Sequence, residues 1–385
     1  MKGFFSLPSI SAGFIAVLVG YTSSAAIVFQ AATAAGAGPA HLSSWLLALG
    51  LGMGATCIGL SLRFRSPVLT AWSTPGAALL GTSLAGLPMS EAIGAFLFAS
   101  ALIALCGATG WVETLMKHIP KTLAAGMLAG VLLRFGLNVF TAFGSQPALV
   151  GLMLGIYLVG RRLNSRYTIP LTFLAGLLWT AAGGMIETTA LTLDVAKPIF
   201  TAPTFTLSTL IGVGIPLFIV TMSSQNVPGL AVLRANGYKT PVSPLIGWTG
   251  VTGLLLAPFG GFQFNLAAIT AAICMSPEAH PDAERRYLAA VWAGIFYLAT
   301  GILGATVAGL FAALPRELVA AIAGIALFGT IGNSLAATLH DAAERDAALV
   351  TFLVTASGLA LFGIGSAFWG LLAGLAVRHI IRENH

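Results

Sequence analysis

The most informative part of the sequence reads Arg65-Ser-Pro-Val-Leu-Thr-Ala-Trp-Ser-Thr-Pro-Gly76. Pro67 and the β-prone residues that follow it predict a short extended piece. Ser73 then offers a hydroxyl as an N-cap, and Pro75 stands in the first turn of the helix expected to follow. The segment therefore predicts a helix that begins abruptly after an extended stretch.

A second segment, Ala257-Pro-Phe-Gly-Gly-Phe-Gln-Phe-Asn265, repeats this plan. Its proline and glycines break the chain, residues 262–264 are expected to be extended, and Asn265 is expected to cap a helix that starts at Leu266. Because both segments lie within apolar stretches, both helices are expected to start inside a membrane. The alternative is that each segment is an ordinary proline kink.

The composition is that of a membrane protein. Of 385 residues, 57% are hydrophobic and 8% are charged, with a mean hydropathy of +0.93, whereas soluble domains carry about 25% charged residues. Apolar stretches recur from end to end and predict an all-α membrane protein of about fourteen transmembrane helices. These spans are placed at residues 11–35, 42–62, 66–86, 90–110, 121–143, 147–160, 168–187, 207–231, 241–258, 262–279, 287–312, 316–337, 347–362 and 364–381.

Positive charge is distributed unequally between the two sides of this arrangement. With the N-terminus in the cytoplasm, the inner segments hold fifteen Lys and Arg residues, and the outer loops hold only Lys197 and Arg316. The positive-inside rule therefore predicts that both termini are cytoplasmic, and the net charge of +6 needs no nucleic-acid partner. The fifteen inner cations are Lys2, Arg63, Arg65, Lys117, Lys121, Arg161, Arg162, Arg166, Arg234, Lys239, Arg285, Arg286, Arg345, Arg378 and Arg382.

The two halves of the chain resemble each other. Ile119-Pro-Lys-Thr-Leu-Ala-Ala-Gly matches Leu314-Pro-Arg-Glu-Leu-Val-Ala-Ala, and Tyr21-Thr-Ser-Ser24 matches Met222-Ser-Ser-Gln225. The offset is about 195 residues, or about seven spans, and an odd number of spans inverts the second half in the membrane. Residues 1–190 and 191–385 are therefore predicted to form two inverted repeats, with helices 3 and 10 broken at corresponding positions.

The two interrupted helices predict an anion site. A helix that starts in mid-bilayer presents unpaired backbone N–H groups and the positive end of its dipole. Trp72 and Phe262, beside the breaks, are placed to stack on a flat ligand, with core packing as the alternative. Polar side chains within spans also indicate a site, although serines serve helix packing equally well. In spans one and eight these include Ser24, Gln30, Gln225 and Asn226.

Arg134 is the cation predicted to lie well inside a span. Either it faces the cavity and holds a carboxylate substrate, or it snorkels toward an interface, and the sequence leaves both open. No carboxylate is predicted deep in a span, so the sequence identifies no residue as a carrier of protons. The chain lacks the motifs of zinc proteases, nucleotide-binding loops and serine hydrolases, so we expect no cofactor and no metal, and an intramembrane enzyme is only a remote alternative.

Five stretches of the chain carry a resemblance to a known family. They are Gly20-Tyr-Thr-Ser-Ser-Ala-Ala26, Leu69-Thr-Ala-Trp-Ser-Thr-Pro-Gly76, Thr221-Met-Ser-Ser-Gln-Asn226, Ala268-Ile-Thr-Ala-Ala-Ile-Cys-Met-Ser-Pro-Glu-Ala-His-Pro281 and Gly363-Ile-Gly-Ser-Ala-Phe-Trp-Gly370. In this order, over essentially the whole chain, the sequence closely resembles the bacterial benzoate:proton symporter (benzoate membrane transport) family. That family looks like a branch of the seven-plus-seven inverted-repeat fold of nucleobase, sulfate and bicarbonate transporters.

The resemblance implies a core domain of helices 1–4 and 8–11, which holds substrate between the starts of helices 3 and 10. It also implies a gate domain of helices 5–7 and 12–14, with elevator-like motion of one domain against the other. One departure stands out, because nucleobase transporters of this fold carry acids on helices 8 and 10. Gln225 takes that place on helix 8 and no acid lies near Asn265, so the site suits an anion better than a neutral base.

Residues and resemblance together predict a secondary transporter in the bacterial inner membrane, surrounded by lipid, that imports benzoate or a similar aromatic carboxylate with protons. Transport of another organic anion or a nucleobase is the nearer alternative, and a passive anion channel is the more distant one. The sequence leaves open whether the protein forms a homodimer, as proteins of related folds often do. The predicted substrate-binding residues are Ser24, Gln30, Trp72, Ser73, Thr74, Gly76, Gln225, Asn226, Gly261, Phe262, Asn265 and Arg134.

Overall fold

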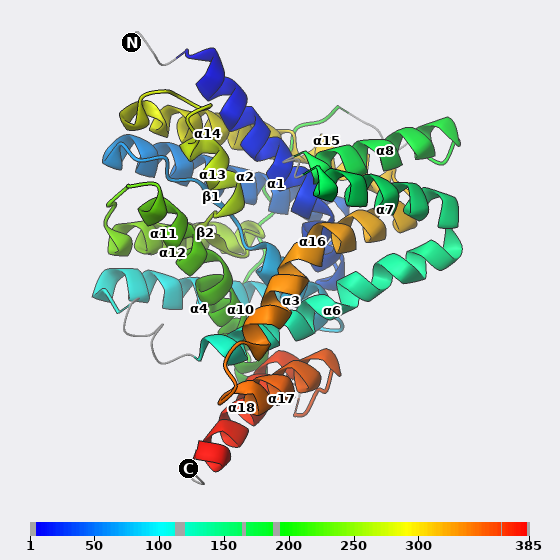
Figure 1. Cartoon of the computed structure of the whole chain (residues 1–385), viewed down its shortest axis with the longest axis vertical. Coiled ribbons are helices and arrows are strands. Elements are labelled where there is room, and N and C mark those ends of the chain that lie inside the picture. Colours follow the sequence, from blue (N-terminus) through cyan, green and yellow to red (C-terminus); the bar gives the residue numbers. More distant parts are fainter. Residues whose placement is uncertain (1–4, 112–119, 164–166, 188–192, 363, 383–385) are drawn as a thin grey trace.

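A computed structural model describes residues 5–111, 120–163, 167–187, 193–362 and 364–382, and these residues are mostly helical (Figure 1). Seven described helices are long and apolar enough to cross a membrane, and an eighth span results if a bent pair is counted as one. The seven are α1 (Leu7–Ala34), α2 (Pro39–Phe64), α4 (Met89–Thr109), α6 (Lys121–Ser145), the run from α9 to α11 (Leu207–Ala235), α12 with the following 3-10 turn η4 (Val242–Phe259) and α16 (Arg316–Leu339).

The remaining helices are shorter than a full crossing. α14 (Tyr287–Ile302) and α15 (Gly304–Ala312) form the bent pair, with an angle of 67° between them, so the predicted eleventh span is broken. Four further short helices are α7 (Pro147–Arg162), α8 (Thr168–Ala182), α17 (Arg345–Ala356) and α18 (Ser366–Arg382).

The predicted eighth span is a continuous run of short helical pieces. It consists of α9 (Leu207–Thr209), the π-helical turn η2 (Leu210–Gly214), α10 (Ile215–Thr221), the π-helical turn η3 (Met222–Asn226) and α11 (Val227–Ala235). A π-turn inserts one extra residue per turn and often marks a functional position. Gln225 and Asn226 both lie in η3.

The predicted third and tenth spans are discontinuous, as expected. β1 (Thr70–Trp72) precedes α3 (Thr74–Ser83), and β2 (Phe264–Leu266) precedes α13 (Ile269–Met275). The two strands pair antiparallel, with Ala71 opposite Asn265. Because backbone groups at membrane depth must be satisfied within the protein, each strand supplies the hydrogen bonds that the other lacks.

The prediction for the start of the second half-helix is wrong by three residues. α13 begins at Ile269, its N-cap is Ala268, and no side chain caps it. Asn265 lies in β2 instead, because pairing with β1 keeps the backbone extended as far as Leu266, and the next N–H, of Ala267, still donates to Leu69 O at 2.9 Å. The extended piece therefore starts and ends later than the sequence indicated.

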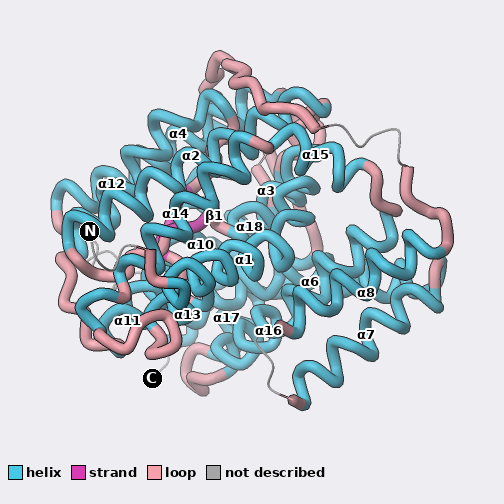
Figure 2. The backbone as a smooth tube through the Cα atoms, turned by 90° about the horizontal axis from the view of Figure 1, so that it is seen from above, coloured by secondary structure: helices cyan, strands magenta, loops and turns pink. Residues whose placement is uncertain are grey.

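The helices pack in two groups. α2 packs against α14 and α4 against α12, whereas α6 packs against α16 and α17, and α7 against α8. Viewed from above, α4, α11 and α12 lie on the left and α6, α7 and α8 on the right (Figure 2). α1 and α3 contact both groups, since α1 packs on α14 and α16 and α3 on α10 and α6. β1 and β2 lie within the first group, where α2 packs on both.

Gly260 makes the turn from the end of the α12 span into the segment of β2. Its φ is +96°, and a Cβ there would lie 1.8 Å from Cδ1 of the buried Trp45. Only glycine combines this backbone conformation with so close an approach.

We expect Gly260→Ala to lower the melting temperature of the purified protein in detergent. Gly36→Ala is the matched control, because Gly36 also has a positive φ (+77°) but nothing lies within 4 Å of its Cβ position. The control should show only the backbone cost of about 1 kcal/mol. Equal melting temperatures for the two variants would contradict the contact with Trp45.

Candidate functional site

Ser73 is the polar centre of the break before α3 and is fully buried. Its backbone N–H donates to Gln263 O at 3.2 Å, and its Oγ accepts from the Gly76 N–H at 3.1 Å and from Thr221 Oγ1 at 3.0 Å. The prediction that Ser73 caps this helix is confirmed. Ser73 therefore connects β1, the segment before β2, and α10.

Thr74 carries the hydrogen-bond donors that remain without a partner at the start of α3. Pro75 has no N–H, while the N–H groups of Gly76 and Ala77 are taken up by Ser73 Oγ and Ser73 O. Among the described residues no partner is found for the Thr74 N–H or hydroxyl, and the side chain is half-buried. The helix terminus thus offers one backbone donor and one hydroxyl donor together with the positive end of its dipole.

Trp72 is held by α1. Its Nε1–H donates to Ser24 Oγ at 2.8 Å, and Ser24 in turn donates to Gly20 O at 2.7 Å. The ring of Tyr21 meets the Trp72 ring edge-on, with 4.8 Å between centroids. Both Ser24 and Trp72 are buried, so the predicted residues of α1 and β1 do meet, in a contact between a serine and an indole.

Asn226 and Asn265 lie on neighbouring elements and are both fully buried. Asn226 Oδ1 accepts from the Leu266 N–H at 2.9 Å, which ties η3 to β2. Asn265 Nδ2 donates to Leu266 O at 3.0 Å, whereas Asn265 Oδ1 has no hydrogen-bond partner. A buried acceptor without a donor is costly unless a ligand or water supplies one.

Gly261 and Phe262 take part in core packing. The N–H of Gly261 donates to Leu256 O at 3.0 Å, and the buried ring of Phe262 packs against Trp45 and Phe96, with centroids 6.2 and 6.1 Å away. Gly76 is also buried, and a Cβ there would lie 2.9 Å from Leu217 Cδ1. Gln30 on α1 and Gln225 in η3 are half-buried, and Arg134 on α6 is exposed.

Gln263 was missed by the sequence analysis. Besides its carbonyl bond to Ser73, its side chain donates to Ser100 Oγ at 3.1 Å and to Phe96 O at 3.3 Å on α4. The available signal was an amide between two phenylalanines in an apolar run, since such a group needs partners inside a membrane.

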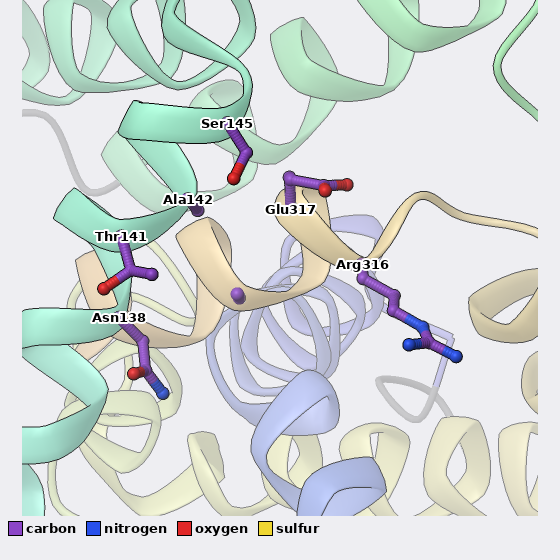
Figure 3. A pocket seen from close by; sticks show the side chains of 7 residues that line it. Asn138, Thr141, Ala142, Ser145, Arg316 and Glu317 are labelled. Carbon is purple, nitrogen blue, oxygen red and sulfur yellow. The ribbon is translucent and has the colours of Figure 1, made fainter.

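Two surface pockets lie elsewhere in the described part of the chain, and the predicted substrate-binding residues line neither of them. One, of about 210 Å³, lies between the end of α6 and the start of α16 and is lined by Asn138, Thr141, Ala142, Ser145, Arg316, Glu317 and Ala320 (Figure 3). The other, of about 360 Å³, is lined by Arg234, Gly237, Lys239 and Thr240 between α11 and α12.

The fold is that of membrane transporters built from inverted repeats. Over 96% of its length the chain superposes on the transmembrane domain of a cyanobacterial bicarbonate transporter, BicA, covering 97% of that domain with a TM-score of 0.61 at 13% identity. It also superposes on the murine anion transporter Slc26a9 in the inward-facing state, with a TM-score of 0.60 at 12% identity, over 98% of this chain and 68% of the other. The predicted fold class is confirmed.

The chain belongs to the BenE family of benzoate membrane transport proteins, whose sequence profile matches residues 3–380. It is 39% identical over 381 residues to the "Benzoate membrane transport protein" of Acinetobacter baylyi, covering 99% of this chain and 97% of that one. It is 53% identical over 367 residues to "Inner membrane protein YdcO" of Escherichia coli, covering 95% and 94%. The protein is therefore a multi-pass membrane transporter and not an enzyme.

We expect Asn226→Ala to destabilise the protein, because it leaves the buried Leu266 N–H without an acceptor. The cost of such an orphaned group is about 1 to 3 kcal/mol, measured as a fall in the denaturation midpoint in detergent. Asn236→Ala is the control, since this exposed asparagine bonds only to Val232 O in its own helix. If both variants were equally stable, the Asn226 contact would not be holding β2.

Proposed function

We propose that the protein imports benzoate or a similar aromatic carboxylate with a proton. The observation that carries this proposal is that the two broken spans hold a helix terminus with free donors and a buried acceptor without a partner. Thr74 offers donors at the start of α3, and Asn265 Oδ1 is a buried acceptor on the paired strand. Membership of the benzoate transport family and the name of the Acinetobacter relative support the choice of substrate.

A protonated carboxyl group matches this pair of features. Its carbonyl oxygen accepts hydrogen bonds and suits the Thr74 donors, while its hydroxyl donates and suits Asn265 Oδ1. In this proposal the proton travels on the substrate itself, and no acid of the protein is needed at the site. Gln225 and Gln30, both half-buried, and the edge of the Trp72–Tyr21 pair complete the proposed pocket. Arg134 lies outside it.

We further propose that α1–α4 and α9–α15 form a core domain and that α6–α8 and α16–α18 form a gate domain. The core would carry the site past the gate by an elevator-like motion. The two groups of packed helices support this division, and α1 and α3 would provide the sliding contact with the gate.

The membrane is proposed to be the bacterial inner membrane, with both termini in the cytoplasm. The fifteen inner and two outer cations support this orientation. Green fluorescent protein fused after His385 should fluoresce, and alkaline phosphatase at the same position should be inactive, because the first folds in the cytoplasm and the second outside it. The opposite pair of results would reverse the orientation.

Proteoliposomes should accumulate labelled benzoate under an inward proton gradient, saturably and only while the gradient lasts. Empty liposomes correct for permeation of the neutral acid, and a protonophore should abolish the protein-dependent part. Because a proton carried as a carboxyl hydrogen moves no net charge, a membrane potential alone should not drive uptake. Accumulation driven by potential without a pH gradient would contradict the proposed mechanism.

In the same vesicles, Thr74→Val and Asn265→Ala should each raise the KM for benzoate, by about tenfold if one hydrogen bond to the substrate is lost. Gln225→Ala should act in the same direction. Thr82→Val is the matched control at the other end of α3, where the exposed hydroxyl bonds only to Leu79 O. An unchanged KM in both Thr74→Val and Asn265→Ala would remove the proposed carboxyl site.

A further inference from the structure

One face of α6 is polar although it lies at membrane depth. Arg134, Asn138, Thr141 and Ser145 recur at the helical spacing of four, three and four residues, and all four are exposed. We call these residues the α6 stripe. At about 1.5 Å per residue, Arg134 lies about 20 Å along the helix from Lys121, close to the middle of a bilayer core about 30 Å thick.

Contact with lipid would be costly for the α6 stripe. A charge and an amide are costly when they face hydrocarbon near the centre of a bilayer. No ion-pair partner lies beside Arg134 in the described part of the chain. Phe140, by contrast, lies on another side of the same helix, where its ring stacks on Phe328 of α16 and stays 59% exposed. One side of α6 therefore suits lipid and the side with the stripe suits water.

Neighbouring helices leave the stripe open. α17 packs on the first half of α6, where Cβ atoms at Gly126 and Gly130 would lie 2.7 Å from Ala348 O and Thr355 Cβ. α17 ends at Ala356, so the second half of α6 continues beyond it. The pocket between α6 and α16 opens there (Figure 3), and its 210 Å³ holds several water molecules or one small organic anion.

The charges around the pocket favour an anion. Arg316 lines it and Arg134 stands at the inner end of the stripe, against the single carboxylate of Glu317. In Figure 3 the Arg316 and Glu317 side chains point in different directions from the start of α16. The hydroxyl and amide groups of the stripe supply hydrogen-bond donors for a carboxylate.

The helix that carries the stripe also packs on α3, whose start forms the proposed substrate site. Phe135, next to Arg134, approaches α3, because a Cβ at Gly81 would lie 3.5 Å from the Phe135 ring. Granted the uptake of an aromatic carboxylate proposed above, we infer that the α6 stripe and the start of α16 form a water-filled outer vestibule, which binds the carboxylate before it reaches the start of α3.

Single cysteines test whether the vestibule contains water. The natural Cys57, Cys106 and Cys274 are free and buried, so an impermeant thiol reagent has little background. Added to the outside of intact cells, the reagent should label Asn138→Cys and Thr141→Cys and spare Phe140→Cys, the control on the lipid side. Excess benzoate should slow the labelling at both stripe positions.

Labelling does not depend on transport, so its result stands even if the uptake assay fails. If neither stripe position is labelled, or if both are labelled only from the cytoplasmic side, the proposal of an outer vestibule is overturned. Labelling that benzoate leaves unchanged would overturn its role as a binding site.

Two charge-neutralising variants test the electrostatic role. Arg316→Gln should raise the KM for benzoate and Glu317→Gln should lower it, each by about two- to threefold at low salt, and both effects should shrink at high salt. The maximal rate should be unchanged. If the two side chains only stabilised the structure, both variants would change the KM for benzoate in the same direction. That result would overturn the proposal.

Discussion

The antiparallel pairing of β1 with β2 is the interaction on which the rest of the structure depends. Three residues from each half of the chain meet in the register Thr70 to Leu266, Ala71 to Asn265 and Trp72 to Phe264. Without this pairing, two pieces of extended backbone would be unsatisfied at membrane depth, where no water compensates. The pair holds the chain extended up to the abrupt starts of α3 and α13.

Most polar groups near the pair are used to hold it together. Ser73 satisfies two N–H groups of α3 and receives the Thr221 hydroxyl, and Asn226 satisfies Leu266. These residues are therefore structural in the first place, whatever they add to substrate binding. The groups left over near the pair are few, namely the Thr74 donors, Asn265 Oδ1 and the Tyr21 hydroxyl beside Trp72. A small, specific ligand suits so small a set better than a large one.

The broken helices could be predicted because their signals are local. Pro67, Ser73 and Pro75 act within a few residues, and Ser73 caps α3 as its position indicates. The role of Asn265 could not be predicted, because the strand partner that keeps it extended lies in the other half of the chain. Phe262 illustrates the same limit, since an aromatic residue beside a break looks identical in sequence whether it meets a ligand or packs on Trp45 and Phe96.

Two described acids at helix ends, Glu91 and Glu344, are engaged in structural contacts, which supports the proposal that the proton travels on the substrate. Glu91 accepts from the hydroxyls of Thr206 and Thr209, and Glu344 is paired with Arg378 at 2.8 Å and accepts from Thr122. Both carboxylates fasten helix ends to neighbouring segments, and neither bonds to a residue of the strand pair. Protonating either would release a structural contact, whereas the proposed mechanism places the proton between substrate and Asn265 and needs only the acceptor that the fold leaves unsatisfied.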